Sequence, residues 1–312
     1  FETWRDTLPA ERAKVMRKAA ALMRERAGDI ARVLTQEQGK PLAEAKGEAL
    51  AAADIIEWFS EEGMRVYGRI VPSRSSLSIR QMVLKDPVGP VAAFTPWNFP
   101  ANLPARKIGG ALAAGCTVVI KPAELTPLTA LAAAELAQRA GFAPGVINVI
   151  TGTDAPAIGQ ALCESDVVRH LSFTGSTEVG RILAAQCAPT VKKMSLELGG
   201  NAPFIVFDDA DLDKAVEGAI IAKYRNMGQT CVCTNRLYVQ SGIHDRFVEK
   251  FASEVIKMKV GDGAEVGVVQ GPLINAKAIE KVERHVADAV ANGAKLVVGG
   301  HLVLPQRGPQ KI

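Results

Sequence analysis

Residues 88–126 read VGPVAAFTPWNFPANLPARKIGGALAAGCTVVIKPAELT, and this stretch decides the fold. Its pattern predicts an apolar strand at 88–94, a proline-rich turn at 95–100, a helix to about 114 and a second strand at 117–121. The alternation continues downstream, with strands predicted at 146–150, 168–173 and 192–197 and helices at 126–139, 155–164 and 177–187. Repeated strand–helix units with short connections are typical of an α/β protein with a doubly wound parallel sheet.

The residues before this stretch are predicted to be mostly helical. Alanine, leucine, arginine and glutamate dominate 9–39 and 41–63, and a Gly-Lys-Pro sequence separates the two predicted helices. Residues 68–84 change character, because apolar residues there alternate with polar turns and favour two extended strands.

The residues after the repeats begin a new strand at 203–207 and a helix at 211–226. The sequence Asp208-Asp209-Ala210-Asp211 is predicted to cap that helix, since an aspartate oxygen accepts hydrogen bonds from free amides of a first turn. A calcium loop is the alternative for these aspartates, but the EF-hand spacing is absent.

The composition indicates an ordinary globular protein. The chain has 312 residues, enough for about two domains, and is 48% hydrophobic and 22% charged. A net charge of +4, without a dense Lys/Arg run, predicts no nucleic-acid partner. We expect no membrane partner, because no uncharged apolar stretch approaches about 20 residues. Five cysteines without framework spacing favour a reducing, cytoplasmic location.

Several polar residues and glycines fall just after predicted strands. Trp97 and Asn98 follow the first strand, Lys121 ends the second, and Gly175 and Ser176 follow the strand at 168–173. Because ligands bind beyond the carboxyl ends of parallel strands, these residues are expected to gather at one edge of the sheet. The glycine-rich turn at 175–180 opens a helix, whose free N–H groups can hold an anion, although this signal is weak by itself.

Cys231 and Glu197 carry the most informative chemistry in the sequence. A thiol can attack a carbonyl carbon and a carboxylate can activate water, so together they suit a covalent route that ends in hydrolysis. The alternative for Cys231 is a small buried hydrophobic residue. A metal site is not predicted, since the Cys-x-Cys pair has no second pair of ligands at suitable spacing.

Five motifs resemble those of the aldehyde dehydrogenase superfamily, in the family's order. They are Pro96-Trp97-Asn98-Phe99-Pro100, Lys121-Pro122-Ala123-Glu124, Phe173-Thr174-Gly175-Ser176-Thr177, Leu196-Glu197-Leu198-Gly199-Gly200 and Gly228-Gln229-Thr230-Cys231. Three further sequences resemble the succinate-semialdehyde dehydrogenase branch: Glu37-Gln38-Gly39-Lys40-Pro41-Leu42, Asn201-Ala202-Pro203-Phe204-Ile205-Val206-Phe207 and Val232-Cys233 after the cysteine motif. The resemblance implies oxidation of an aldehyde, with succinic semialdehyde as the expected substrate.

The resemblance also implies the catalytic roles. Cys231 is expected to be the nucleophile, Glu197 the general base, and Asn98 a side-chain amide donor to the oxyanion. Another semialdehyde or an acylating enzyme is the alternative within the family, and Glu197 favours hydrolysis.

The cofactor implied by the resemblance is NAD, with NADP as the alternative. Lys121 and Glu124 are expected to hold the adenosine ribose, and Gly175 and Ser176 to face the pyrophosphate. Trp97 lies beside the pyrophosphate in this interpretation, and Leu198 completes the cofactor-binding set.

Two arginines and a second cysteine complete the predicted site. Arg106 and Arg225 match positions that bind a substrate carboxylate in this branch, and the alternative is that each is a surface or helix-end cation. Cys233 is a redox candidate, because it lies two residues from Cys231 and can form a strained disulfide with it. The alternative is that Cys233 merely lines the pocket.

The family pattern divides the chain into expected domains. Residues 1–68 and 88–198 are expected to form the dinucleotide-binding domain, 69–87 the strands of a homo-oligomer interface, and 199–312 an incomplete catalytic domain. The chain is expected to be truncated at both ends relative to the family, because the family normally has a further segment before Phe1 and residues 301–312 do not match its expected continuation. A non-catalytic fragment that only binds nucleotide or a partner is the rival interpretation.

Overall fold

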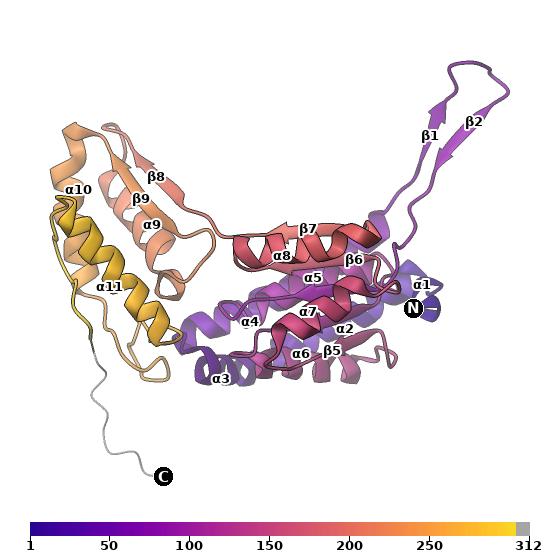
Figure 1. Cartoon of the computed structure of the whole chain (residues 1–312), viewed down its shortest axis with the longest axis horizontal. Coiled ribbons are helices and arrows are strands. Elements are labelled where there is room, and N and C mark those ends of the chain that lie inside the picture. The colour runs from indigo at the N-terminus through magenta and orange to yellow at the C-terminus, as the bar shows by residue number, and fades with distance from the viewer. Residues whose placement is uncertain (304–312) are drawn as a thin grey trace, which may run out of the picture. The chain divides into compact units, whose positions relative to one another are not determined.

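The computed structural model describes residues 1–303 and consists of two compact units. The first unit contains residues 1–33 and 46–198, and the second contains 34–45 together with the chain from 199 onward. Residues 34–45, which the sequence placed in the first domain, therefore belong with the second unit. Figure 1 shows the elements of both units along the chain.

A five-stranded parallel sheet forms the centre of the first unit. Its strands are β3 (Val91–Phe94), β4 (Val118–Lys121), β5 (Ile147–Val149), β6 (His170–Thr174) and β7 (Lys193–Glu197). They lie in the order β5-β4-β3-β6-β7, and every neighbouring pair is parallel. The direction of winding reverses between β3 and β6, and such a switch point leaves a crevice beyond the strand ends where ligands bind. The prediction of a doubly wound α/β fold is confirmed.

Helices cover both faces of this sheet. The helical elements up to residue 190 are α1 (Glu2–Arg5), α2 (Pro9–Glu25), α3 (Ala27–Gln38), α4 (Leu42–Glu62), η1 (Gly63–Arg65), α5 (Asn102–Ala113), α6 (Pro127–Ala140), α7 (Ala155–Glu164), α8 (Thr177–Cys187) and η2 (Ala188–Thr190). The end of α3 and the start of α4 belong to the second unit. Helix α2 packs against α5 and α6, whereas α7 and α8 pack against each other.

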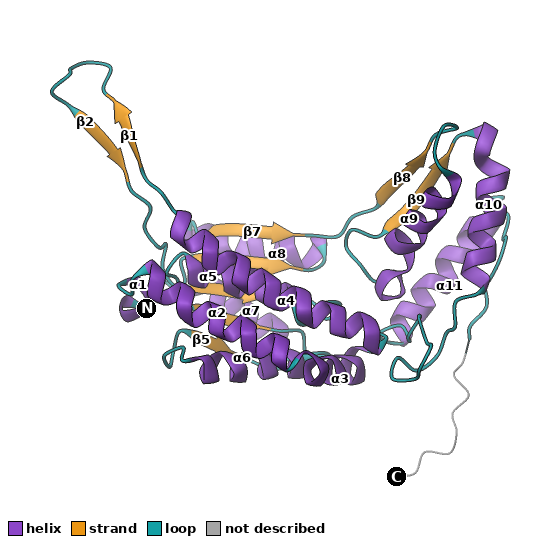
Figure 2. Ribbon diagram, turned by 180° about the vertical axis from the view of Figure 1, so that it is seen from behind, coloured by secondary structure: helices purple, strands orange, loops and turns teal. Residues whose placement is uncertain are grey.

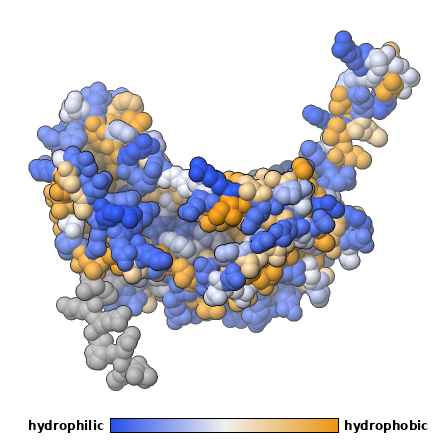
Figure 3. Space-filling model, in the orientation of Figure 1, coloured by the Kyte–Doolittle hydropathy of each residue, from blue (hydrophilic) through white to orange (hydrophobic). Residues whose placement is uncertain are grey.

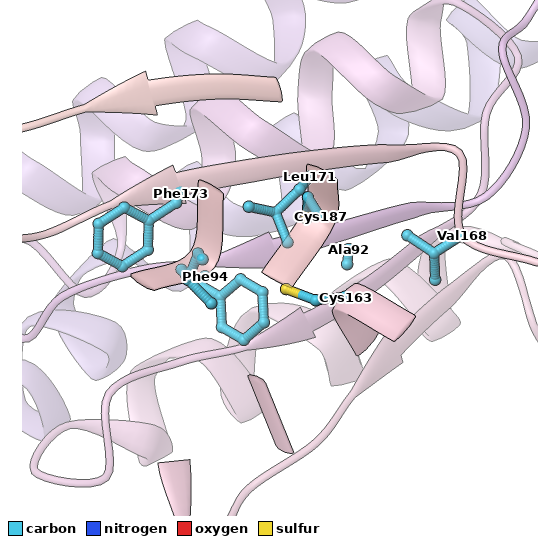
Figure 4. Packing of buried hydrophobic residues seen from close by; sticks show 8 residues of the cluster. Ala92, Phe94, Cys163, Val168, Leu171, Phe173 and Cys187 are labelled. Atoms are coloured by element: carbon cyan, nitrogen blue, oxygen red, sulfur yellow. The ribbon is translucent and has the colours of Figure 1, made fainter. Parts of the chain in front are cut away.

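Strand β3 supplies side chains to both layers of the core. Ala92 and Phe94 pack with residues of β6, α7 and α8, while Ala93 packs with Val118 and Ile120 of β4 on the other face. Successive side chains of a strand point to opposite faces, so a continuously apolar strand is buried on both sides. Figure 4 shows the first of these clusters, with Phe173 and Leu171 above Phe94 and Cys163.

An antiparallel hairpin extends from the first unit. It consists of β1 (Arg69–Pro72) and β2 (Arg80–Val83), and Arg69 is opposite Val83 in its register. The hairpin stands clear of the sheet (Figure 2), and apolar side chains are visible along it in the hydropathy view (Figure 3). Ile70 and Met82 are each 69% exposed, so the hairpin buries little apolar surface within this chain.

The second unit has a two-stranded parallel sheet with helices packed beside it. Its elements are β8 (Ala202–Val206), α9 (Leu212–Tyr224), η3 (Arg225–Gly228), β9 (Thr234–Val239), α10 (Ser241–Ile256) and α11 (Ala276–Ala291). Its core joins Val206, Val216, Ala219, Ile243 and Phe247. Asp211 caps α9 as predicted, because its carboxylate accepts from the amides of Asp213 and Lys214.

The structure corrects two element boundaries. The single helix predicted at 9–39 is divided into α2 and α3 at Arg26, whose φ of −98° and ψ of 13° depart from helical values. The helix predicted at 211–226 ends at Tyr224, because Arg225 has a non-helical ψ of 131° and Asn226 and Met227 then adopt left-handed conformations. The prediction for the chain end at 301–312 lies, from residue 304 on, outside the described residues.

Candidate active site

The turn after β3 carries Trp97 and Asn98, and both are half-buried. A carboxylate from α4 fixes the end of this turn. Oε1 of Glu48 accepts hydrogen bonds from the amides of Ala101 at 2.9 Å and Asn102 at 3.2 Å, at the start of α5. Glu48 is only 5% exposed, so these charge-assisted bonds form in a water-poor environment. Sequence reasoning missed Glu48, although a glutamate between buried alanines of a helix was an available signal.

Lys121 and Glu124 form an ion pair at the carboxyl end of β4. Nζ of Lys121 lies 2.9 Å from Oε2 of Glu124, and the lysine side chain is 5% exposed while the glutamate is 44% exposed. The hydrogen bond from Lys121 holds the pKa of Glu124 below its usual value. The amide of Thr95 donates to the Lys121 carbonyl at 3.3 Å, which ties the turn after β3 to the end of β4.

Gly175 and Ser176 connect β6 to α8. The Gly175 amide donates to the Glu197 carbonyl at 3.0 Å, and Oγ of Ser176 accepts from the Val179 amide at 3.2 Å as the N-terminal cap of α8. Leu198 is half-buried and packs against the apolar cluster that includes this helix. The first turn of α8 therefore presents backbone N–H groups at the sheet edge, where such groups suit a phosphate.

Glu197 is the last residue of β7, and its side chain is exposed. A lysine that sequence analysis did not single out lies near it. Nζ of Lys107, on α5, donates to Oγ of Ser172 at 2.9 Å. Burial lowers the pKa of Lys107 to about 8, and the charge of Glu197 opposes that shift. The available signal was a lysine beside the apolar, glycine-rich half of its predicted helix.

Arg106 and Arg225, the predicted carboxylate binders, are both exposed. Nε of Arg106 donates to Oδ1 of Asn102 on its own helix at 3.0 Å. Arg225 lies at the C-terminal end of α9, and its carbonyl accepts from Oγ1 of Thr230 at 3.3 Å. The two residues belong to different units.

The two cysteines of the Cys-x-Cys pair have different environments. Cys231 is exposed, whereas Cys116, Cys163, Cys187 and Cys233 are buried, and all five are free thiols. Sγ of Cys233 donates to the Lys223 carbonyl at 3.3 Å. A disulfide between Cys231 and Cys233 stays a prediction.

The turn before Cys231 has an unusual backbone. Asn226, Met227 and Gly228 have φ of 53°, 56° and 73°, so three consecutive residues are left-handed. Asn226 is fully buried, and its Oδ1 accepts from Nε2 of Gln38 at 2.9 Å. Asparagine tolerates this region better than most residues, but methionine does not, so surrounding contacts must hold the turn.

Metal-ligand clusters and membrane-spanning helices are both absent from the part of the chain that the structure describes. Within residues 1–303, no group of three or more His, Cys, Asp or Glu side chains is arranged to hold a metal ion. Among the helices of that range, none has the length and apolar character needed to cross a membrane.

Comparison with known proteins decides the family. Residues 1–311 match the model of the Aldehyde dehydrogenase family. The chain belongs to the aldehyde dehydrogenase family. The resemblance drawn from its motifs is thus confirmed.

Named relatives include enzymes of the expected branch. This aldehyde dehydrogenase chain is 60% identical over 297 residues to the Escherichia coli protein named succinate-semialdehyde dehydrogenase [NADP(+)] GabD, covering 95% of the chain and 61% of the relative. It is 59% identical over 297 residues to the glutarate-semialdehyde dehydrogenase of Pseudomonas aeruginosa, again covering 95% of the chain and 61% of the relative. The chain therefore spans about three fifths of the length of these relatives.

A solved structure shares the fold. The crystal structure of an aldehyde dehydrogenase from Brucella melitensis biovar abortus matches with a TM-score of 0.95 and 58% identity, covering 97% of this chain and 62% of that one.

Proposed function

We propose that this chain belongs to an enzyme that oxidises a short aldehyde with a terminal carboxylate, succinic semialdehyde in the first place, to the acid with NAD(P). The observation that carries the proposal is the exposure of Cys231 in the family's cysteine motif, while the other four cysteines are buried. A nucleophile has to be accessible to substrate, and the thiolate is the reactive form of cysteine.

The proposed chemistry assigns one step to each residue. The Cys231 thiolate adds to the aldehyde carbon, and the Asn98 amide donates to the oxyanion that forms, a contact worth about 3–4 kcal/mol in comparable sites. NAD(P), when bound, would supply the acceptor for the hydride that leaves this carbon. A thioester then joins the acyl group to Cys231, and Glu197 takes a proton from the water that hydrolyses it. Hydrolysis returns the free thiol and releases the carboxylic acid.

The sheet edge of the first unit fits a dinucleotide. Amides of α8 at Gly175 and Ser176 suit the pyrophosphate, and the ammonium of Lys121 and carboxylate of Glu124 suit ribose hydroxyls. Trp97 and Leu198 are proposed to contact the cofactor at the same edge. We expect NAD to be preferred over NADP, because the Glu124 carboxylate accepts from a 2′-hydroxyl but repels a 2′-phosphate.

The substrate class rests on the relatives and on two exposed guanidinium groups. Relatives are named for succinate semialdehyde and glutarate semialdehyde, and one from Pseudomonas putida is named 3-sulfolactaldehyde dehydrogenase, so each named aldehyde carries an anionic group. Arg225 and Arg106 offer the planar donor forks that suit such anions.

The remaining assignments concern domains and assembly. The first unit is proposed as the dinucleotide-binding domain, and the unit from 199 onward as part of the catalytic domain. The β1–β2 hairpin is proposed as the strand pair of a homo-oligomer interface, and the protein is proposed to act in the cytoplasm.

The proposal is tested by an NADH-production screen of aldehydes with and without a terminal carboxylate, combined with alkylation of Cys231. Turnover that requires a terminal carboxylate and disappears in Cys231→Ala would support the proposal. Selective turnover of neutral aldehydes would contradict the substrate class. Nucleotide binding without turnover, from a chain whose Cys231 reacts no faster than a free thiol, would favour the nucleotide-binding rival.

A further inference from the structure

The left-handed turn ahead of Cys231 is held by side chains from a distant part of the sequence. Nε2 of Gln38 donates to Oδ1 of Asn226 at 2.9 Å, and Oε1 of Glu44 accepts from the Asn226 amide at 2.8 Å. Both donor and acceptor come from the segment 34–45, which is part of the second unit. Asn226 is thus bound through its side chain and its backbone at once.

Asn226 also forms hydrogen bonds with Gln229, which lies two residues before Cys231. Its Nδ2 donates to the Gln229 carbonyl at 3.1 Å, and its own carbonyl accepts from the Gln229 amide at 2.9 Å. Oε1 of Gln229 in turn accepts from the Ile274 amide at 3.0 Å. Gln229, two positions before Cys231, is therefore held through its carbonyl, its amide and its side chain.

Segment 34–45 is itself anchored in the second unit. Gln38 is 2% exposed, and its Oε1 accepts from the Lys40 amide at 3.0 Å. The Leu42 amide donates to the Gly263 carbonyl at 2.9 Å. A Cβ added at Gly263 would lie 2.5 Å from the Gly39 carbonyl oxygen, so only glycine permits this close approach.

The strained backbone indicates what the network is for. Non-glycine residues at positive φ persist only where surrounding contacts over-determine them, and they concentrate at functional sites. Asn226 and Met227 are two of the three such residues in the described range, and they lie within five residues of Cys231. The fully buried Asn226 takes part in four of the hydrogen bonds described above, two through its side-chain amide and two through its backbone.

We propose that Asn226, held by Gln38 and Glu44, is a positioning residue that sets the orientation of the Cys231 thiol. The inference rests on the proposed function, because it takes Cys231 as the nucleophile. Gln38 acts one step further away, by orienting the Asn226 amide so that its Nδ2 faces the Gln229 carbonyl. Loss of either side chain should slow attack by the thiol without weakening the binding of the molecule attacked.

The test uses the whole chain and two thiol reagents that need no cofactor. Iodoacetamide measures alkylation at Cys231, located by peptide mass spectrometry, and p-nitrophenyl acetate gives an acylation rate constant and an apparent dissociation constant separately. The variants are Gln38→Met and Asn226→Gly, where glycine permits the left-handed backbone but removes the side-chain hydrogen bonds with Gln38 and Gln229. Gln36→Met is the matched control, because Gln36 is an exposed glutamine on the same helix.

Both variants are expected to lower the acylation rate constant by roughly tenfold, with the dissociation constant changed less than about threefold. The control is expected to match the unmodified chain. Assays are run at a temperature at which circular dichroism shows each variant to be fully folded. If Gln38 and Asn226 had a purely structural role, the substitutions would lower the melting temperature and leave the rate constants unchanged. Unchanged rate constants in both variants, with Cys231 reactive in the unmodified chain, would overturn the positioning role and leave the proposed function standing.

A pH series with Asn226→Asp gives a second, independent readout. Protonated, the introduced carboxyl group can donate to the Gln229 carbonyl as the amide does, whereas ionised it can only accept. The ratio of its acylation rate constant to that of the unmodified chain should therefore fall as pH rises from 5 to 9. A ratio that does not change with pH would contradict the proposal. If Cys231→Ala were acylated as fast as the unmodified chain, the proposed function and the positioning role would both fail.

Discussion

Removal of the Glu124 carboxylate is expected to change which adenine nucleotide the sheet edge selects. In Glu124→Ser, the Lys121 ammonium loses the carboxylate that lies 2.9 Å away. The lysine side chain is only 5% exposed, so its unpaired charge can then be neutralised by a 2′-phosphate. Two unit charges at about 4 Å interact by about 4 kcal/mol at an effective dielectric constant of 20. Because Glu124 is 44% exposed, solvent screening reduces this to about 1–3 kcal/mol. The preference should move by about ten- to a hundredfold towards the 2′-phosphate.

The assay needs only the adenosine half of the cofactor. Dissociation constants for 5′-AMP and 2′,5′-ADP are measured by calorimetry for the unmodified chain and for Glu124→Ser. Because Lys121 holds the pKa of Glu124 below its usual value, the carboxylate stays ionised between pH 7 and pH 8, where the phosphate groups of both ligands are also largely doubly charged, so the discrimination should be constant across that range. Tighter binding of 2′,5′-ADP by the unmodified chain, or an unchanged ratio in the variant, would refute the reasoning.

Four further predictions concern the stability of the chain and the chemistry of the proposed site. Glu48→Ala leaves two amides at the start of α5 without their carboxylate and should lower the free energy of unfolding by about 2–4 kcal/mol, measured as a melting temperature several degrees lower. The control Glu61→Ala removes an exposed ion pair with Arg17 and should lower it by under about 1 kcal/mol. Lys107 has a pKa of about 8 in the folded chain, below its ordinary 10.5, so the free-energy cost of burying its charge is fully present below pH 8 and disappears as pH rises to 10.5. The free energy of unfolding should therefore rise between pH 8 and 10.5 in the unmodified chain but not in Lys107→Met, and parallel pH curves for the two proteins would contradict this. In an active enzyme of this sequence, Glu197→Gln should still transfer hydride but hydrolyse the thioester slowly, giving an NADH burst of up to about one per site, and normal steady turnover would remove Glu197 as the base. Arg225→Ala should lower kcat/KM for succinic semialdehyde by roughly ten- to a hundredfold and affect a neutral aldehyde of similar length much less; an equal loss on both would indicate a folding role.

The parallel sheet could be predicted because its strands are short apolar segments bounded by turn residues, as at 88–94 and 117–121. Residues after these strands were placed at one edge for the same reason, since parallel strands end together. The break at Arg26 could not be predicted, because most residues on both sides favour helix and the nearest glycine, Gly28, lies inside α3. Strand β9 and helices α10 and α11 were not predicted either.

The buried polar contacts could not be predicted from the sequence for a different reason. Glu48, Lys107 and Gln38 act through partners that are 53, 65 and 188 residues away in the sequence. Periodicity describes a residue's neighbours on its own element, and it carries no information on which amide or hydroxyl a distant fold will bring beside it. A charged or amide side chain on an apolar helix face indicates that such a partner exists without identifying it.

The membership of residues 34–45 in the second unit has a consequence for how the protein is made. Gln38 is synthesised 188 residues before its partner Asn226, which at ordinary translation rates is a delay of about 10–40 s. During that interval the end of α3, including Leu34, which is fully buried in the finished protein, has none of the later residues to pack against. The turn beside Cys231 therefore reaches its final conformation only after residues 34–45 have packed against the later part of the second unit. Until then, we expect the Cys231 thiol of a nascent chain to lack its final orientation.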